Sequence, residues 1–299
     1  MNVSILLSTA EQGLIYSLVA LGLYVSFRTL DIADLTTDGS FTLGIVTCTA
    51  LTAAGHPVLA FFGALAAGAA AGLVTALLQT KLGVQPILAG IITMTALVSV
   101  NLMVLGGKSN QTLLRADTLF TRAQGLLGDL GGLALAGAAA LLCGGLLVLF
   151  LRTQLGLSLR ATGDNRAMVA ASSINPAFTT TVGLCLANAV IALSGALLAQ
   201  QQGYGDTTLG TGMVVIGLAS LVIGEVLTGR RGGVAGGVAA CVLGSVVYRI
   251  ITALALTSRL GAVNLKLVSA VIVAAAISYP AVAEKIKLAQ KRRKAGRHA

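Results

Sequence analysis

Three acidic residues stand close together near the N-terminus, beside two threonines, and they are the side chains best suited to chemistry. Asp31, Asp34 and Asp38 fall within eight residues of one another. Ionisable residues inside a membrane-spanning segment are costly and usually functional, although acids at a helix end in water have no such role. We expect no metal site, because no histidine accompanies the acids and the EF-hand pattern is absent.

A weak sequence echo links this region to a second one. Residues 35–40 (LTTDGS) and 205–210 (GDTTLG) each precede an apolar run. Paired glycine-interrupted segments are typical of the translocation path in transporters built from repeats, and turn chemistry alone is the alternative. The candidate path residues are Asp34, Thr36, Thr37, Asp38, Ser40, Asp206, Thr207 and Thr208.

The polar connection 152–175 carries the second set of candidates. From Ser158 we expect a short amphipathic helix with Leu159, Met168 and Ala171 on one small-residue face, and Pro176 opens the next apolar run at a favoured first-turn position. Two interpretations stay open: a solvated loop that holds arginines, and a docking helix for a cytoplasmic partner. The candidate coupling residues are Arg160, Ala161, Asp164, Asn165, Arg166, Met168 and Ala171.

Motifs for catalysis are missing. Gly107, Lys108 and Ser109 resemble the end of a phosphate-binding loop, but Leu102 stands where that motif needs glycine. No zinc-protease motif, nucleophile elbow or histidine cluster is present. We therefore expect no catalytic residue, no cofactor and no metal, and any ATPase must be a separate subunit.

The composition indicates that most of the chain lies in a lipid bilayer rather than in water. Of 299 residues, 56% are hydrophobic and 10% are charged, where soluble domains carry about 25% charged residues, and the mean hydropathy is +0.91. The net charge of +10 does not indicate nucleic acid, because the basic residues lie between apolar runs and in the tail. The four cysteines each lie in an apolar run and are expected to be small buried hydrophobes. Gly68 and Gly72 have GxxxG spacing, a weak signal for a helix-pairing face.

A polytopic transmembrane helical bundle, all-α, is the predicted fold. A span needs about 20 apolar residues, and nine segments qualify: approximately 11–30, 39–55, 57–79, 84–105, 130–151, 176–199, 211–228, 233–256 and 262–281. One or two broken or re-entrant helices are expected at 31–44 and 203–212, because these stretches are polar or rich in glycine. Residues 1–283 form a single membrane domain and 284–299 a basic cytoplasmic tail.

Orientation follows from the positive residues. With nine spans and a cytoplasmic tail, fourteen of the twenty lysines and arginines fall inside and four outside, which predicts the N-terminus outside and the C-terminus inside. The connection 106–129 is then the largest external loop and a candidate docking surface for an external partner, as are Gln200, Gln201, Gln202 and Tyr204. Glu225 and Arg249 are expected at different depths, too far apart to pair easily.

The run 156–175 (GLSLRATGDNRAMVAASSIN) resembles the coupling-helix segment of permeases in the branched-chain amino acid and ribose class of ABC importers. Residues 34–41 (DLTTDGSF) are similar to a subgroup with the pattern D-L-T-x-D-G-S-F, associated with amino acid uptake of the tryptophan and tyrosine type. Residues 224–237 match the glycine-rich run that follows the seventh span in this family. Ser173 stands where the family usually places glycine.

This resemblance implies a permease subunit of the cell inner membrane with several partners. They are a cytoplasmic ABC ATPase that grips the helix around 160–171, an external solute-binding lipoprotein, a second permease copy that forms a homodimer, and membrane lipid. Residues 31–44 correspond to an interrupted helix beside the pathway in that class. The alternatives are a secondary transporter driven by an ion gradient and a membrane enzyme that uses the aspartate cluster.

Overall fold

The computed structural model describes residues 3–257 apart from 115 and 230–232, together with positions 271, 274 and 278. Most of this part is helical, as predicted, and the described residues also form a ribbon of two short strands. In chain order the elements are α1 (Val3–Leu23), the π-helical η1 (Tyr24–Thr29), α2 (Thr37–Ala53), α3 (Leu59–Thr80), α4 (Pro86–Val104), β1 (Asn110–Thr112), α5 (Leu119–Leu127), η2 (Gly128–Leu130), α6 (Gly131–Arg152), α7 (Gln154–Asp164), α8 (Arg166–Ala171), α9 (Pro176–Gln202), β2 (Tyr204–Asp206), α10 (Met213–Thr228) and α11 (Gly233–Thr257).

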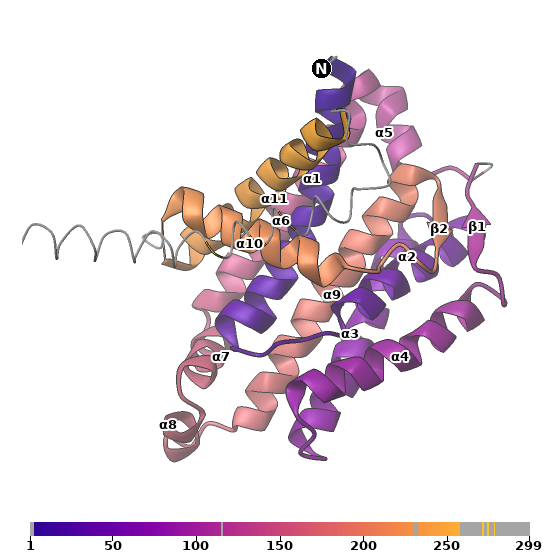
Figure 1. Ribbon diagram of the computed structural model, residues 1–299. Helices are drawn as coiled ribbons and strands as arrows, with labels where there is room; N and C mark the ends of the chain where they lie inside the picture. The colour runs from indigo at the N-terminus through magenta and orange to yellow at the C-terminus, as the bar shows by residue number, and fades with distance from the viewer. Residues whose placement is uncertain are drawn as a thin grey trace, which may run out of the picture.

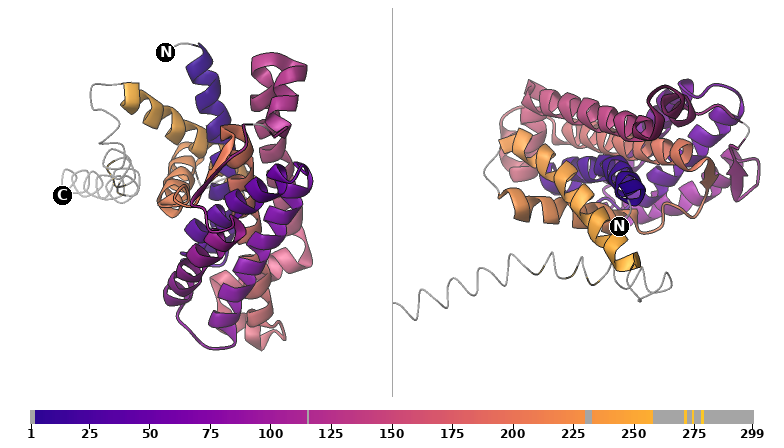
Figure 2. Two further views of the ribbon diagram at one scale, coloured as in Figure 1. Left: turned by 90° about the vertical axis from the view of Figure 1, so that its right-hand side faces the viewer. Right: turned by 90° about the horizontal axis from the view of Figure 1, so that it is seen from above.

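The long helices define the height of the molecule, and its two ends carry different elements. Helices α1, α6 and α9 run along that height, with the N-terminus and α5 at one end and α7 and α8 at the other (Figure 1). Helix α10 instead lies across the bundle, as the views in Figures 1 and 2 agree. The strands pair antiparallel, with Gln111 opposite Gly205, and so join the loop after α4 to the segment after α9.

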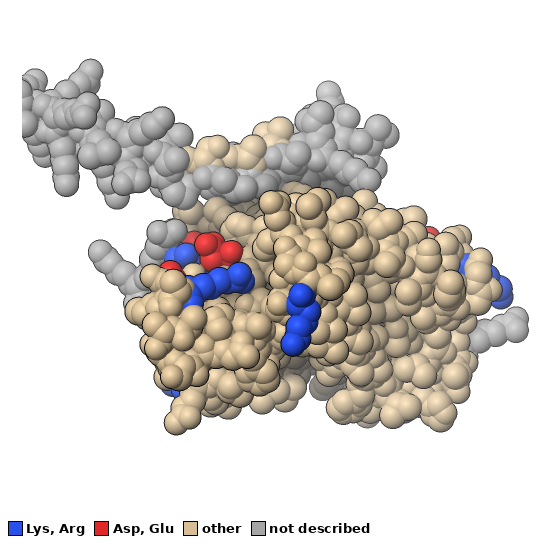
Figure 3. All heavy atoms as spheres, turned by 90° about the horizontal axis from the view of Figure 1, so that it is seen from below, with Lys and Arg blue, Asp and Glu red and all other residues tan. Residues whose placement is uncertain are grey.

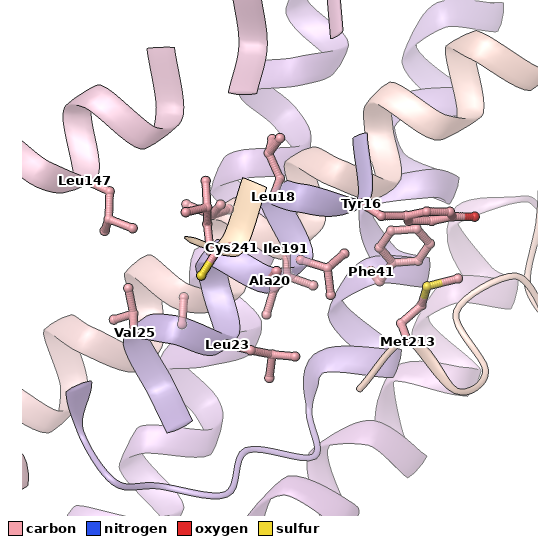
Figure 4. Packing of buried hydrophobic residues seen from close by; sticks show 14 of the residues in the cluster. Tyr16, Leu18, Ala20, Leu23, Val25, Phe41, Leu147, Ile191, Met213 and Cys241 are labelled. Carbon is pink, nitrogen blue, oxygen red and sulfur yellow. The ribbon is translucent and has the colours of Figure 1, made fainter. Parts of the chain in front are cut away.

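Helix α9 is the centre of the bundle. Its most apolar window is 78% buried, whereas the corresponding window of α6 is 22% buried. One apolar cluster joins α9 to α1, α2, α10 and α11 through Ile191, Tyr16, Phe41, Met213 and Cys241 (Figure 4). Large apolar side chains stay exposed on α3, α4 and α6, as expected of helices whose outer faces contact lipid.

Small residues let α3 and α9 approach each other closely. A Cβ atom at Gly68 would lie 2.4 Å from the carbonyl oxygen of Asn188, and one at Gly72 would lie 2.4 Å from that of Leu184. A side chain at either position would force the two helices apart. The GxxxG pair is therefore a helix-pairing face within the chain, packed against α9.

Eight of the nine predicted spans correspond to described helices. Six helices are long and apolar enough to cross a membrane, namely α1 with η1, α3, α4, α6, α9 and α11. The predicted spans 39–55 and 211–228 correspond to α2, with 17 residues, and α10, with 16. The ninth, 262–281, lies outside the described residues except for isolated positions.

Candidate translocation centre and docking segment

The polar segment 30–36 interrupts the helical path of the chain between η1 and α2, as expected for 31–44. Its backbone is non-helical from Asp31 to Asp34, and Asp31 adopts a φ of +54°, a left-handed conformation that aspartate tolerates better than most residues. Backbone groups inside an apolar bundle need partners, and Ile32 N–H donates to the carbonyl of Ser26 at 2.9 Å. The interruption therefore places polar side chains inside the bundle.

Asn188 of α9 connects the polar groups of this segment. Its Nδ2 donates to Oδ2 of Asp34 at 2.7 Å and to the carbonyl of Leu184 at 3.0 Å, and its Oδ1 accepts from the Ser40 hydroxyl at 2.7 Å. Asp34 and Asn188 are 2% and 0% exposed. Sequence reasoning missed Asn188, although an asparagine inside an apolar run was the available signal.

The two threonines of the segment belong to the same buried centre. The Thr36 hydroxyl bonds that of Thr75 on α3 at 2.8 Å, and the Thr37 hydroxyl donates to the Asp34 carbonyl at 3.1 Å. Asp34 Oδ1 also accepts from the Thr36 N–H at 2.9 Å. These bonds tie α2, α3 and α9 together, so four of the candidate path residues are enclosed rather than open to a cavity.

Asp38, in the first of the two segments that echo each other in the sequence, binds the start of α10, which follows the second segment. Its Oδ2 accepts from Gly212 N–H at 2.8 Å and its Oδ1 from Val214 N–H at 2.9 Å. These are unpaired donors at the N-terminus of α10, where a carboxylate is stabilised by the helix dipole. The partly exposed Asp38 therefore fixes the point inside the bundle at which α10 begins.

The turn 206–208 lies between β2 and α10. Asp206 Oδ1 accepts from the Thr208 N–H at 2.7 Å and from its hydroxyl at 2.6 Å, which is ordinary turn chemistry. Asp206 and Thr207 are half-buried and Thr208 is exposed. Within the described residues no group of three acids, histidines or cysteines could hold a metal ion.

The docking segment, residues 153–171, differs from the predicted single helix. Thr153, not Ser158, caps α7, because its Oγ1 accepts from Gly156 N–H at 3.3 Å, while Ser158 lies inside the helix. Asn165 then ends α7 and caps α8 by accepting from Met168 N–H at 3.0 Å. The expected common face is wrong, since the break turns α8: Leu159 is 1% exposed and Met168 is 57% exposed.

Close contacts hold the docking segment against the bundle. A Cβ atom at Gly163 would lie 2.0 Å from the carbonyl oxygen at the end of η1. The hydroxyls of Thr162 and Thr179 bond at 2.8 Å, which joins α7 to the first turn of α9. Of the coupling candidates, Ala161 is half-buried, and the exposed ones are Arg160, Asp164, Asn165, Arg166, Met168 and Ala171. On the face seen from this end, charged side chains form only a few small groups (Figure 3).

Three polar residues at the margins of the bundle have defined partners. Glu225 lies 2.9 Å from Arg28 Nε, which agrees with the expectation that it does not pair with Arg249. Arg249 contacts α1 instead. Gln200 is 2% exposed and its Nε2 donates to the Pro57 carbonyl at 2.9 Å, so its expected place on a docking surface is wrong. The cysteines are free. Cys48 and Cys241 are buried as expected, whereas Cys143 and Cys185 are half-buried, so the expected burial of these two is wrong.

Residues 5–279 match the family model described as the permease component of branched-chain amino acid transport systems. The chain belongs to this permease family. It is the membrane component of a binding-protein-dependent transport system and a multi-pass inner-membrane protein. Permeases of such ABC importers work with an ATPase and a solute-binding protein, which decides against a transporter driven by an ion gradient.

Two relatives cover almost the whole permease. A protein named tyrosine transport system permease protein, from Clostridioides difficile (strain R20291), is 36% identical over 271 residues, which are 90% of this chain and 89% of the relative. The uncharacterized protein RP368 of Rickettsia prowazekii (strain Madrid E) is 29% identical over 92% of this chain and 97% of its own length. No solved structure matched the permease.

The departure from the family pattern at Ser173 keeps the backbone that glycine would adopt. This permease has Ser173 at a φ of +60°, in the left-handed region that favours glycine. The turn from α8 into α9 therefore survives the substitution, and the serine holds it at a cost of about 1 kcal/mol.

Proposed function

We propose that this permease carries an amino acid through a path formed with a second copy, and that a cytoplasmic ATPase drives it by gripping the docking segment. The observation that carries the proposal is the docking segment itself. It presents exposed charged and apolar side chains at one end of the molecule, and the contacts of Gly163 and Thr162 connect it to η1 and α9. A displacement of the segment is thereby passed to the helix that holds the polar centre.

The proposed topology has nine spans with the N-terminus outside. In its support, the N-terminus and α5 lie at one end of the molecule and α7 and α8 at the other (Figure 1). The inner end would then carry Arg28, Lys81, Arg152, Arg160 and Arg166, in agreement with the positive-inside rule. Loop 106–129 would face the solute-binding protein, and 284–299 would lie in the cytoplasm.

The proposed wall of the path is the partly exposed part of the candidate set. Asp38 binds the N-terminus of α10, and Asp206, Thr207 and Thr208 lie in the turn that precedes this helix. Asp34, Thr36, Thr37 and Ser40 are buried. A Cβ atom at Gly210 would lie 2.3 Å from the carbonyl oxygen of Asp38, so the two echoing segments meet at this point. ATP hydrolysis belongs to the partner subunit.

The proposed solute is an amino acid. It is supported by the name of the Clostridioides relative, a tyrosine transport permease. The test is uptake of radiolabelled amino acids, taken from a panel, by proteoliposomes that contain the permease, the ATPase and the binding protein. Uptake that requires ATP supports the proposal. Uptake of none of the panel, or uptake with an ion gradient in the absence of the ATPase, contradicts it.

The docking segment is tested by charge reversal. In the double variant Arg160→Glu, Arg166→Glu, we expect about tenfold less ATPase to copurify with the tagged permease, because two exposed charge contacts at about 0.5–1 kcal/mol each would be lost. Arg122→Glu is the matched control for copurification, since Arg122 is exposed on α5 at the opposite end. If the double variant copurifies as much ATPase as the wild type, the proposed docking role is wrong.

A further inference from the structure

A cavity of about 260 Å³ lies between the N-terminal part of α1 and the C-terminal part of α11. This is close to the lower limit of about 300 Å³ for small-molecule sites, so the cavity suits one small solute. Its wall is formed by Ile5, Ser8, Thr9 and Gln12 of α1 and by Arg249, Thr252 and Ala253 of α11.

Arg249 is the charged residue of this wall. Its Nε donates to Gln12 Oε1 at 3.0 Å, and its Nη2 donates to the same oxygen. The Cζ atom lies 5.0 Å from the ring centre of Tyr16, a cation–π contact. A guanidinium has five N–H donors, so bonds to one oxygen leave several of them free for another acceptor.

No carboxylate of the described residues neutralises Arg249. The ion pairs found in residues 3–114, 116–229 and 233–257 involve other basic residues. Glu11, the acid next to Gln12 in the sequence, faces α6, where a Cβ atom at Gly132 would lie 2.6 Å from its Oε1. An arginine in a membrane-spanning helix normally pairs with a partner, and an anionic ligand would neutralise Arg249 in this cavity.

The other natural anion site of the bundle is already filled. Helix N-termini attract carboxylates, and discontinuous helices use them to hold anionic substrate groups. At the N-terminus of α10, however, Asp38 takes the N–H groups of Gly212 and Val214. A solute carboxylate therefore needs a different donor.

We propose that Arg249 binds the carboxylate of the transported amino acid in this cavity. The wall also suits the ammonium group: the hydroxyls of Thr9 and Thr252 already donate to backbone carbonyls at 2.6 and 2.8 Å, so their oxygens are left as acceptors. Gln12 is a positioning residue that orients the guanidinium. The inference rests on the proposed amino acid solute and adds the residue that recognises it.

A lipid phosphate offers the same oxyanion chemistry to Arg249, and the test separates the two sources. The experiment measures equilibrium binding of labelled L-tyrosine to the permease–ATPase complex in nanodiscs without the binding protein, so that only the permease selects the solute. L-Tyrosinamide, which lacks the carboxylate, is the competitor. If the uptake panel identifies another amino acid, that amino acid and its amide replace this pair.

Arg249→Gln should weaken L-tyrosine binding about 10- to 100-fold, the value of a hydrogen bond to a charged group, and should abolish the preference over tyrosinamide. The affinity of Arg249→Lys for L-tyrosine should lie between those of the wild type and Arg249→Gln, because lysine keeps the charge but lacks the paired N–H donors of the guanidinium. The matched control is Lys81→Gln, which removes an exposed charge at the end of α3. Its binding should equal that of the wild type.

Two results would overturn the site while leaving the amino acid function intact. One is unchanged L-tyrosine binding and unchanged preference in Arg249→Gln. The other is phosphatidylglycerol that copurifies with the wild type but not with Arg249→Gln, again with unchanged amino acid binding, which would assign the arginine to lipid. If the wild-type complex takes up no amino acid of the panel, the proposed function fails, and the carboxylate site fails with it.

Discussion

The centre around Asn188 and the cavity beside Arg249 both hold polar side chains in apolar surroundings, but they satisfy them differently. At the centre, both amide N–H donors and the amide oxygen of Asn188 have partners within the chain. At the cavity, the Arg249 guanidinium has one amide oxygen and one ring face. The centre is closed, and the cavity has room for a further molecule.

This difference separates groups that hold the fold from groups that await a ligand. A buried network whose members are all satisfied stiffens the helices that it joins. Removing one member leaves its buried partners without hydrogen bonds, which lowers the free energy of unfolding. A polar group beside a cavity that has only some of its hydrogen bonds contributes little to the stability of the fold, and it forms further hydrogen bonds when a ligand binds. The predictions below measure this contrast.

Replacing Asn188 should produce the largest loss of stability. Asn188→Leu keeps the approximate volume but leaves Asp34 Oδ2 and the Ser40 hydroxyl without partners, so the free energy of unfolding should fall by about 2–4 kcal/mol. Unfolding in mixed detergent micelles, followed by circular dichroism, measures it.

The matched control is Asn101→Leu on α4. Asn101 is buried as well, but its Oδ1 has no hydrogen-bond partner among the described residues, so the free energy of unfolding should change by less than about 1 kcal/mol. Equal losses at the two positions would show that the network at the centre contributes nothing beyond burial.

The next effect tests the helix contact that brings α3 to the centre. Gly68→Ala places a methyl group 2.4 Å from the Asn188 carbonyl oxygen, so α3 must shift, and the variant should lose about 1–3 kcal/mol. Gly145→Ala on α6 has nothing within 4 Å of its new methyl group and should match the wild type within about 1 kcal/mol. A destabilised Gly145→Ala would mean that the assay does not report on helix packing.

A smaller effect is expected where Asp38 caps α10. Asp38→Asn keeps one acceptor but loses the second acceptor and the charge, so about 1 kcal/mol of stability should be lost, and hydrogen exchange at Gly212 and Val214 should become faster. Asp31→Asn is the control, because Asp31 is exposed and asparagine accepts its left-handed backbone. Unchanged exchange at α10 in Asp38→Asn would contradict the cap.

The membrane fold could be predicted because it depends on composition and run length. Apolar segments of about 20 residues identified the long helices, and the glycine-rich and polar stretches marked the interruptions before α2 and α10. The predicted spans 39–55 and 211–228 correspond to α2 and α10, which are shorter than the other long helices, because counting apolar residues in a window does not fix where a helix begins and ends. The strands β1 and β2 were missed because three-residue strands leave no periodicity.

The candidate site was predicted in part. The echo between 35–40 and 205–210 identified two segments that do meet, but no sequence pattern says which polar residues will be enclosed. Asn188 lies 154 positions from Asp34, and only the packing of α9 against α2 brings them together. The docking segment was predicted as one helix that starts at Ser158. The structure has two helices, capped by Thr153 and Asn165, and the sequence does not distinguish these caps from Ser158 because serine is as good a capping residue as threonine or asparagine.

The smallest stability effect is expected at Arg249, and it completes the comparison. If the guanidinium awaits a ligand, Arg249→Gln should change the free energy of unfolding by less than about 1 kcal/mol, because the desolvation cost of the half-buried charge offsets the hydrogen bonds and the cation–π contact that the variant gives up. The same unfolding assay as for Asn188→Leu measures it, and saturating L-tyrosine should stabilise the wild type but not the variant. A loss as large as that of Asn188→Leu would place Arg249 among the residues that hold the fold, and the contrast between the two regions would disappear.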